Sequence, residues 1–171
     1  MQALIRFFVE LCLLRRAPQD LPASDTLLRL ALSVDLVAGV LVGLASGLGL
    51  GSSVAQGIAE LAFQLGLLYA ALRLTGHLGR FTQSATALLG SGALFGLLAL
   101  GPLGLSPTGS EESDAAALGA FLLLGLVVWN LVVIGHIVRH TFGLSLAQGV
   151  VVGLAYEVSA IVLIAVLFGA S

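Results

Sequence analysis

Five long apolar runs dominate this chain of 171 residues. They cover residues 27–50, 53–75, 82–103, 116–136 and 146–168. Each run is close to the ~20 residues that an α-helix needs to cross a bilayer. Only 9% of the residues are charged, against roughly 25% in a soluble domain, so charge cannot cover a water-facing surface. The sequence therefore predicts an all-α fold, a polytopic membrane bundle of five transmembrane helices.

The segment before the first run is apolar on one side only. Within residues 1–17, apolar residues recur at helical spacing at Leu4, Phe7, Phe8, Leu11 and Leu14. Arg6 and Glu10 lie off that face, and the segment is too short and too charged to span. We expect an amphipathic helix, either lying in the membrane interface or packed under the bundle. Residues 18–26, with two prolines, form a linker, and residues 27–168 form the five-helix domain.

The arginines predict the topology of the bundle. All of them precede or open the first run, or flank the connectors after the second and fourth: Arg6, Arg15, Arg16, Arg29, Arg73, Arg80 and Arg139. The other two connectors contain no arginine, and one carries Glu111, Glu112 and Asp114. Because cytoplasmic loops are enriched in basic residues, we expect a cytoplasmic N-terminus and an external C-terminus. We also expect the connector between the first two runs to be very short, at residues 51–52.

Acidic residues lie near the middle of three runs, where a carboxylate is costly and should face the bundle interior. We expect the first, second and fifth runs to converge there. The predicted polar seam contains Asp35, Gln56, Glu60, Gln64, Asn130 and Glu157. Two interpretations are open. Protonated or paired acids fix the helix register, or the acids form a path for protons or cations.

Glycines at steps of four mark predicted helix-packing faces, because small residues let membrane helices approach closely. Asp35 is followed at this spacing by Gly39, Gly43 and Gly47. The last run places Gly149 and Gly153 at the same spacing before Glu157. These glycines therefore predict close helix contacts on the faces that carry the acids.

Basic and histidine side chains gather at the predicted cytoplasmic face: Arg73, His77, Arg80, His136, Arg139 and His140. Histidine can ligate metals, but no acid or cysteine accompanies these residues at the same depth. We expect the cluster to meet lipid phosphates. The single cysteine, Cys12, excludes internal disulfides and cysteine-rich metal sites. The sequence predicts no metal and no cofactor.

Two stretches resemble the Yip1-domain family, especially its bacterial members. LTGHLGRFTQSATALLG (residues 74–90) joins two runs through a short His/Arg/Gly connector, and VVWNLVVIGHIVRHTFGLSLAQGVVVGL (residues 127–154) joins the last two. The resemblance implies five spans, a cytoplasmic N-terminus and a bacterial cytoplasmic (inner) membrane. Eukaryotic members engage small GTPases through longer N-terminal regions. Here no Asp-Leu-Tyr-Gly-Pro motif is present, so that role does not follow.

The sequence favours a function without catalysis, since it carries no intramembrane protease, HExxH or nucleotide-loop motif. A net charge of −2 disfavours nucleic acid. We expect a scaffold or assembly subunit that meets the lipid bilayer and another membrane protein or a second copy. The alternative is a small proton- or cation-coupled transporter or channel that uses Asp35, Glu60 and Glu157.

Overall fold

The computed structural model describes residues 2–105 and 113–169, and over these residues the chain forms six α-helices, two short 3-10 helices and no strand. Most of the connector between the third and fourth runs, including Glu111 and Glu112, lies outside the described residues. The predicted all-α fold with five membrane-length helices is confirmed. In chain order the elements are α1 (Gln2–Cys12), η1 (Pro18–Asp20), α2 (Asp25–Ala45), α3 (Leu50–Leu74), η2 (Leu78–Arg80), α4 (Phe81–Leu103), α5 (Asp114–Phe142) and α6 (Leu146–Phe168).

Serine side chains begin three of the long helices by accepting backbone N–H groups that have no partner inside the helix. Ser24 caps α2 and Ser113 caps α5. Ser145 caps α6 and forms a capping box with Gln148, whose side chain accepts the Ser145 N–H at 2.9 Å. These caps fix the helix starts close to the predicted positions.

Two helix ends differ from the prediction. α2 ends at Ala45, so the predicted connector at residues 51–52 is wrong and the turn covers residues 46–49. Gly47 adopts φ +87°, and the Leu48 N–H donates to the Gly43 carbonyl at 3.0 Å, a glycine-terminated helix end. α5 instead continues beyond His136 to Phe142, because no residue stops the helix before Gly143, where φ is +73°.

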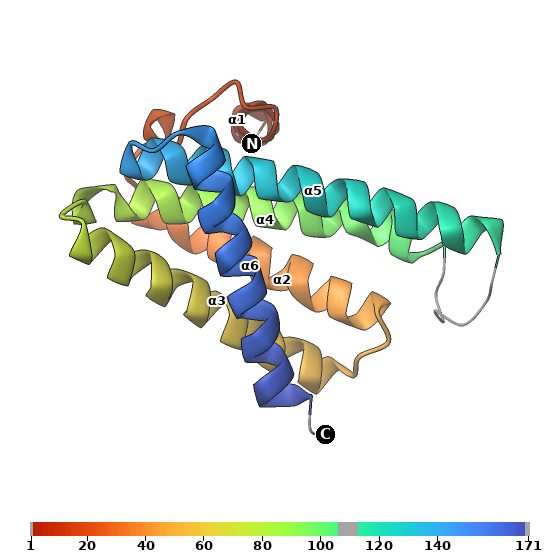
Figure 1. Ribbon diagram of the computed structural model, residues 1–171. Coiled ribbons are helices and arrows are strands. Elements are labelled where there is room, and N and C mark those ends of the chain that lie inside the picture. The colour runs from red at the N-terminus through yellow and green to blue at the C-terminus, as the bar shows by residue number, and fades with distance from the viewer. Residues whose placement is uncertain (1, 106–112, 170–171) are drawn as a thin grey trace.

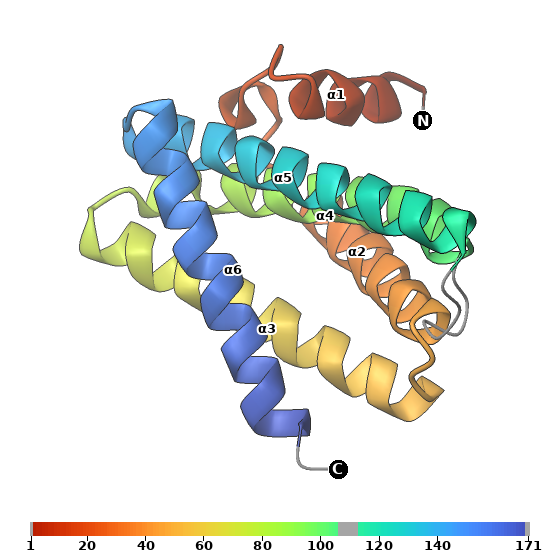
Figure 2. The same cartoon turned by 45° about the vertical axis from the view of Figure 1, so that its right-hand side comes forward.

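The long helices form a bundle in which α4 is central (Figures 1 and 2). α4 packs on α2 and α5, α3 packs on α2, and α6 crosses α5 toward α3. We call the end that holds the connectors from α3 to α4 and from α5 to α6 the arginine end (Figure 1). The opposite end, with the turn from α2 to α3, is the loop end. The halves of the bundle nearest these ends are the arginine half and the loop half.

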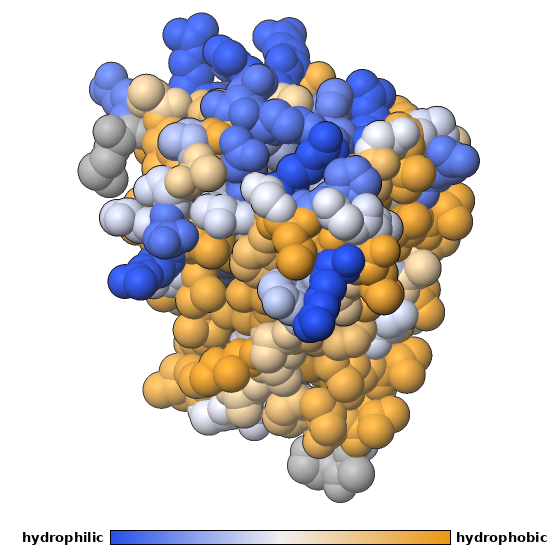
Figure 3. All heavy atoms as spheres, turned by 90° about the vertical axis from the view of Figure 1, so that its left-hand side faces the viewer, coloured by the Kyte–Doolittle hydropathy of each residue, from blue (hydrophilic) through white to orange (hydrophobic). Residues whose placement is uncertain are grey.

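α1 lies across α4 and α5 on the outside of the bundle (Figures 1 and 2). Seen from the arginine end, hydrophilic residues gather on the side where α1 lies, and hydrophobic residues cover the side of α3 and α6 (Figure 3). Large apolar side chains stay exposed along all five long helices, from Leu30 on α2 to Leu167 on α6. Such a surface suits lipid rather than water, and the chain is an integral membrane protein.

The buried core is concentrated in the arginine half. In α4 the buried residues lie between Ser84 and Phe95, and in α5 most of them lie between Val133 and Thr141. Leu68 and Leu72 of α3 join the same cluster. This asymmetry leaves room for a cavity toward the loop end.

Candidate functional site

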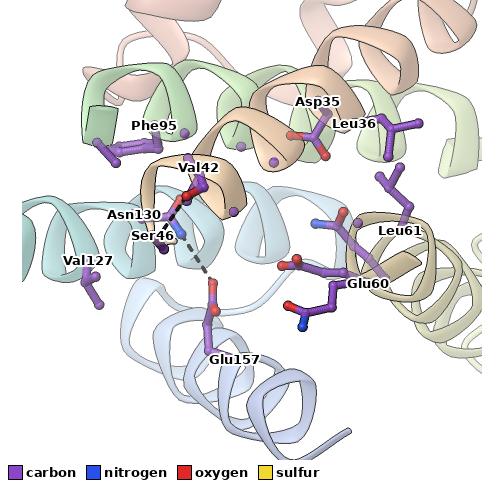
Figure 4. A pocket seen from close by; sticks show the side chains of 18 of the residues that line it. Asp35, Leu36, Val42, Ser46, Glu60, Leu61, Phe95, Val127, Asn130 and Glu157 are labelled. Carbon is purple, nitrogen blue, oxygen red and sulfur yellow. Dashed lines mark hydrogen bonds between the residues drawn. The ribbon is translucent and has the colours of Figure 1, made fainter. Parts of the chain in front are cut away.

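A cavity of about 530 Å³ lies among the five long helices. Every residue of the predicted polar seam lines it: Asp35, Gln56, Glu60, Gln64, Asn130 and Glu157. Figure 4 shows Asp35, Glu60 and Glu157 reaching into it from α2, α3 and α6. The seam is therefore a hollow and not a direct three-helix contact, since α2 packs chiefly on α4 while α4 and α5 provide walls.

The three carboxyl groups have different surroundings. Glu157 accepts a hydrogen bond from the Asn130 amide at 3.2 Å (Figure 4). Asp35 lies against Gly92 of α4, where an added Cβ would stand 2.8 Å from the Asp35 Oδ1. Within the described chain, neither Asp35 nor Glu60 receives a hydrogen bond from another residue. Two carboxyl groups thus face the cavity without a partner from the protein.

No positively charged side chain compensates these acids among the described residues that line the cavity. The acids also do not converge closely enough for three His, Cys, Asp or Glu side chains of the described chain to hold one metal ion. An ionised carboxylate in an apolar span is costly without a counter-charge. The arrangement suits mobile protons or a ligand that carries its own positive charge.

The cavity runs from the loop end into the middle of the bundle. Ser46 and Leu48, at the turn from α2 to α3, line one end, and Leu88 and Ile134 line the other. Leu88 and Ile134 also belong to the buried cluster of the arginine half. Apolar packing therefore closes the cavity toward the arginine end.

The glycines of α2 differ in what they contact. Gly43 faces α3, because a Cβ there would come within 2.9 Å of the Ser53 Cβ. Gly39 lines the cavity and has no neighbour within 4 Å of an added Cβ, and Gly47 ends the helix. The predicted packing role of Gly39 and Gly47 is wrong. No other helix comes within contact distance of Gly39, and Gly47 lies beyond the end of α2 at Ala45.

Two α6 glycines lie directly on α5. An added Cβ on Gly149 would meet the Gly135 carbonyl oxygen, and one on Gly153 would meet Ile134. Sequence reasoning missed Gly92 and Gly96 of α4, where α2 approaches through Asp35 and Ala38. Their spacing of four residues is the signal that could have found them.

Several side chains of the predicted lipid-facing cluster instead turn inward. Arg80 donates to the Thr141 carbonyl at 2.6 Å at the end of α5. His136 is buried, and its Nε2 bonds the Arg16 carbonyl at 2.7 Å. His77 has a buried Nδ1 with no hydrogen-bond partner in the described chain. For Arg80 and His136 the predicted headgroup role is wrong, because each bonds a backbone carbonyl of the protein instead: Arg80 that of Thr141 at the end of α5, and His136 that of Arg16 in the N-terminal segment.

The other three members lie nearer the surface. Arg73 is exposed in the last turn of α3, and Arg139 and His140 are half-buried near the end of α5. Contact of these three with lipid phosphates stays a prediction. Comparison with protein-family models, curated proteins and solved structures finds no match to this chain.

Proposed function

We propose that this chain is a non-enzymatic multi-pass membrane protein that takes protons or small cations into the bilayer through its acid-lined cavity. The observation that carries the proposal is the cavity of about 530 Å³, into which three carboxyl groups point and no cationic side chain of the described chain reaches. A seam that served only to fix the helix register would be closed, with its acids paired. Here the acids face open space.

The cavity suggests a path with one open and one closed end. A proton or cation entering from the loop end would meet three carboxyl groups on three different helices: Glu157, held by Asn130, Glu60 and Asp35. Beyond them the apolar cluster of the arginine half blocks the way. Passage would require that cluster to open, as alternating access demands of transporters.

The proposal includes the setting expected from the sequence. We place the protein in a bacterial cytoplasmic membrane, with the arginine end in the cytoplasm, as the arginine distribution favours. Membership of the Yip1-domain family stays a prediction on the two resembling stretches. So does the scaffold function, whose partner would be another membrane protein or a second copy.

The direct test is ion flux into liposomes that contain the purified protein. We expect the wild type to dissipate an imposed pH gradient or a sodium or potassium gradient faster than empty liposomes. Glu60→Gln, Glu157→Gln and Asp35→Asn, made one at a time, should each lower the flux toward the empty-liposome rate. Each change removes a charge but keeps the shape of the side chain.

Asp25→Asn is the matched control, because Asp25 is an exposed carboxyl in the first turn of α2, outside the cavity. It should leave the flux unchanged. Equal flux in the wild type and in all three cavity variants would contradict the proposal. A discrete complex with another polypeptide, extracted in native lipid nanodiscs, together with absent flux would favour the scaffold function.

A further inference from the structure

The cavity is larger than a proton or a single metal ion needs. Its volume of about 530 Å³ falls within the roughly 300–1,000 Å³ of cavities that hold small organic molecules. Among the described residues, no three acids or other metal-binding side chains lie close enough together to hold one metal ion. The space therefore fits an organic molecule better than a bare ion.

Apolar side chains from four helices form much of the cavity wall. Leu36 of α2, Leu61 of α3 and Phe95 of α4 line it (Figure 4), and Leu126 of α5 completes this set. Small-molecule sites have this composition, a mainly apolar wall with a few polar groups that orient the ligand. Such a wall accepts a hydrocarbon body and disfavours an ion that keeps its hydration shell.

The polar groups of the wall include several acceptors without a partner. Gln56, Glu60 and Gln64 follow one another at steps of four along α3, so they share one helix face, and all three line the cavity. Within the described chain, the side chains of these residues and of Asp35 make no hydrogen bond. A molecule that donates several hydrogen bonds would satisfy them together.

The charge of the wall favours a cation over an anion or a neutral molecule. Three carboxyl groups reach into the cavity, and no cationic side chain of the described residues lines it. An ionised carboxylate inside the membrane needs a counter-charge. A protonated amine supplies this charge and also three N–H donors with no acceptor of its own, which matches the free acceptors of α2 and α3.

The cavity also continues into the lipid-facing side of the bundle. Val127 of α5 lines it and is 56% exposed, and Leu124, one turn away on the same helix, is 62% exposed. Close to this point Glu157 bonds Asn130, but α6 then leaves α5 and crosses toward α3 (Figures 1 and 2). A molecule dissolved in the bilayer therefore reaches the cavity without crossing the apolar cluster of the arginine half.

We propose that the cavity binds a primary amine with an apolar body. The ammonium group lies among Asp35, Glu60 and the glutamines of α3, and the apolar body lies along the wall that leads to Val127. This names the substrate class of the proposed function, so movement of the amine across the bilayer rests on that function. Binding of the amine does not.

The test is calorimetric titration of hexylamine at pH 7 into lipid nanodiscs that contain the protein, with the heat of empty nanodiscs subtracted. We expect saturable binding to the wild type. Hexan-1-ol, which lacks the charge, and hexyltrimethylammonium, which lacks the N–H donors, should each bind at least roughly tenfold more weakly, as the loss of hydrogen bonds to charged groups gives. Methylamine, which lacks the apolar body, should also bind more weakly.

Variants of the acids test where the ammonium group binds. Glu60→Gln and Asp35→Asn should each weaken hexylamine binding by roughly tenfold or more. Asp25→Asn is the matched control, since it neutralises an exposed carboxyl of α2 outside the cavity, and it should leave the affinity unchanged.

A second pair of variants tests whether the apolar body occupies the cavity. Gly39→Leu adds a side chain to the cavity, because Gly39 lines it and has no neighbour within 4 Å of an added Cβ. We expect roughly tenfold weaker binding of hexylamine. Gly66→Leu adds the same side chain to α3 at an exposed position that also has no such neighbour, and it should change nothing. Both variants should elute from size exclusion as the wild type does.

Hexylamine that binds no better than to empty nanodiscs, or no better than hexan-1-ol, would overturn the proposal. Equal affinity for hexyltrimethylammonium would overturn the role of the N–H donors and with it the assignment to a primary amine. Flux is measured separately. Saturable binding without flux would refute transport alone, and proton flux without hexylamine binding would refute the amine site alone.

Discussion

The two halves of this bundle are built from the same kinds of helix but are packed in different ways. In the arginine half, α4 and α5 are buried nearly continuously, from Ser84 to Leu89 and from Val133 to Val138. In the loop half, the same helices turn apolar residues such as Leu98 and Phe121 outward and border an open cavity.

The polar groups follow the same division. In the arginine half they are satisfied by close bonds between segments, for example Arg80 to the Thr141 carbonyl and Ser84 to Thr141. Around the cavity, the one such bond that the described residues make to an acid is the longer one between Asn130 and Glu157, at 3.2 Å. One half therefore anchors the fold, and the other leaves polar groups free to bind and to move.

The largest expected change in stability comes from substituting one glycine in each half: Gly149, which lies in close contact with α5, and Gly39, which faces the cavity. Gly149→Ala places a methyl group against the Gly135 carbonyl, so α6 must move away from α5. We expect a loss of about 1–3 kcal/mol, as overpacking gives. Gly39→Ala adds the same methyl group to open cavity space, where the better helix propensity of alanine predicts a gain of up to ~1 kcal/mol. Thermal unfolding in detergent, monitored by size exclusion, measures both.

Equal losses at both positions would contradict the difference between the halves. A loss of stability in Gly39→Ala alone would mean that the cavity half is the more tightly packed one. The pair is informative because the two substitutions are chemically identical and both lie within membrane-spanning helices.

A smaller effect is expected from one hydrogen bond in each half. Ser84→Ala removes a buried bond of 2.9 Å to Thr141, whose own hydroxyl still donates to the Ile137 carbonyl. We expect a loss of about 1 kcal/mol. Asn130→Ala removes the longer bond to Glu157 in the cavity wall. It should cost less than ~0.5 kcal/mol, because a water molecule that enters the cavity can donate to Glu157 in place of the amide. A larger loss for Asn130→Ala would mean that the cavity half also stabilises the fold.

The sequence predicted the helices and the polar lining because both follow from periodicity within one helix. Asp35, Glu60 and Glu157 each lie on the polar or small-residue face of their own span, and all three line the cavity. The sequence did not predict which neighbouring helix α2 packs against, and so it did not predict that a cavity separates the three polar faces. That choice depends on the approach of α2 to Gly92 and Gly96 of α4, a contact between distant segments.

The sequence also could not predict that the side chains of His136 and Arg80 turn into the protein. Their partners are backbone carbonyls of Arg16 and Thr141, which any residue at those positions would provide. The end of α2 was misplaced for a different reason. Gly51 lies four residues beyond Gly47 and continues the same glycine series in the sequence. Of the two, only Gly47 adopts the left-handed backbone that ends a helix.

The smallest expected effect concerns the charges on α1, which belong to the arginine half alone. Hydrogen bonds from Arg6 and then Arg16 hold the pKa of Glu10 below its ordinary value of 4.5. A carboxyl with a lowered pKa in the folded state stabilises that state above its ordinary pKa, and the contribution is lost as the pH falls through the lowered value.

The folded conformation of α1 and of the turn that brings Arg16 to Glu10 should therefore be equally stable from neutral pH to about 4.5 and less stable below it. Trp129, the only tryptophan, reports this directly, because its indole donates to the carbonyl of Cys12, the last residue of α1. Its fluorescence should shift to the red in a step below pH 4.5, and Glu10→Gln should flatten that step. A step that persists unchanged in Glu10→Gln would assign it to other acids, such as those of the cavity, and would mean that acid acts on both halves together.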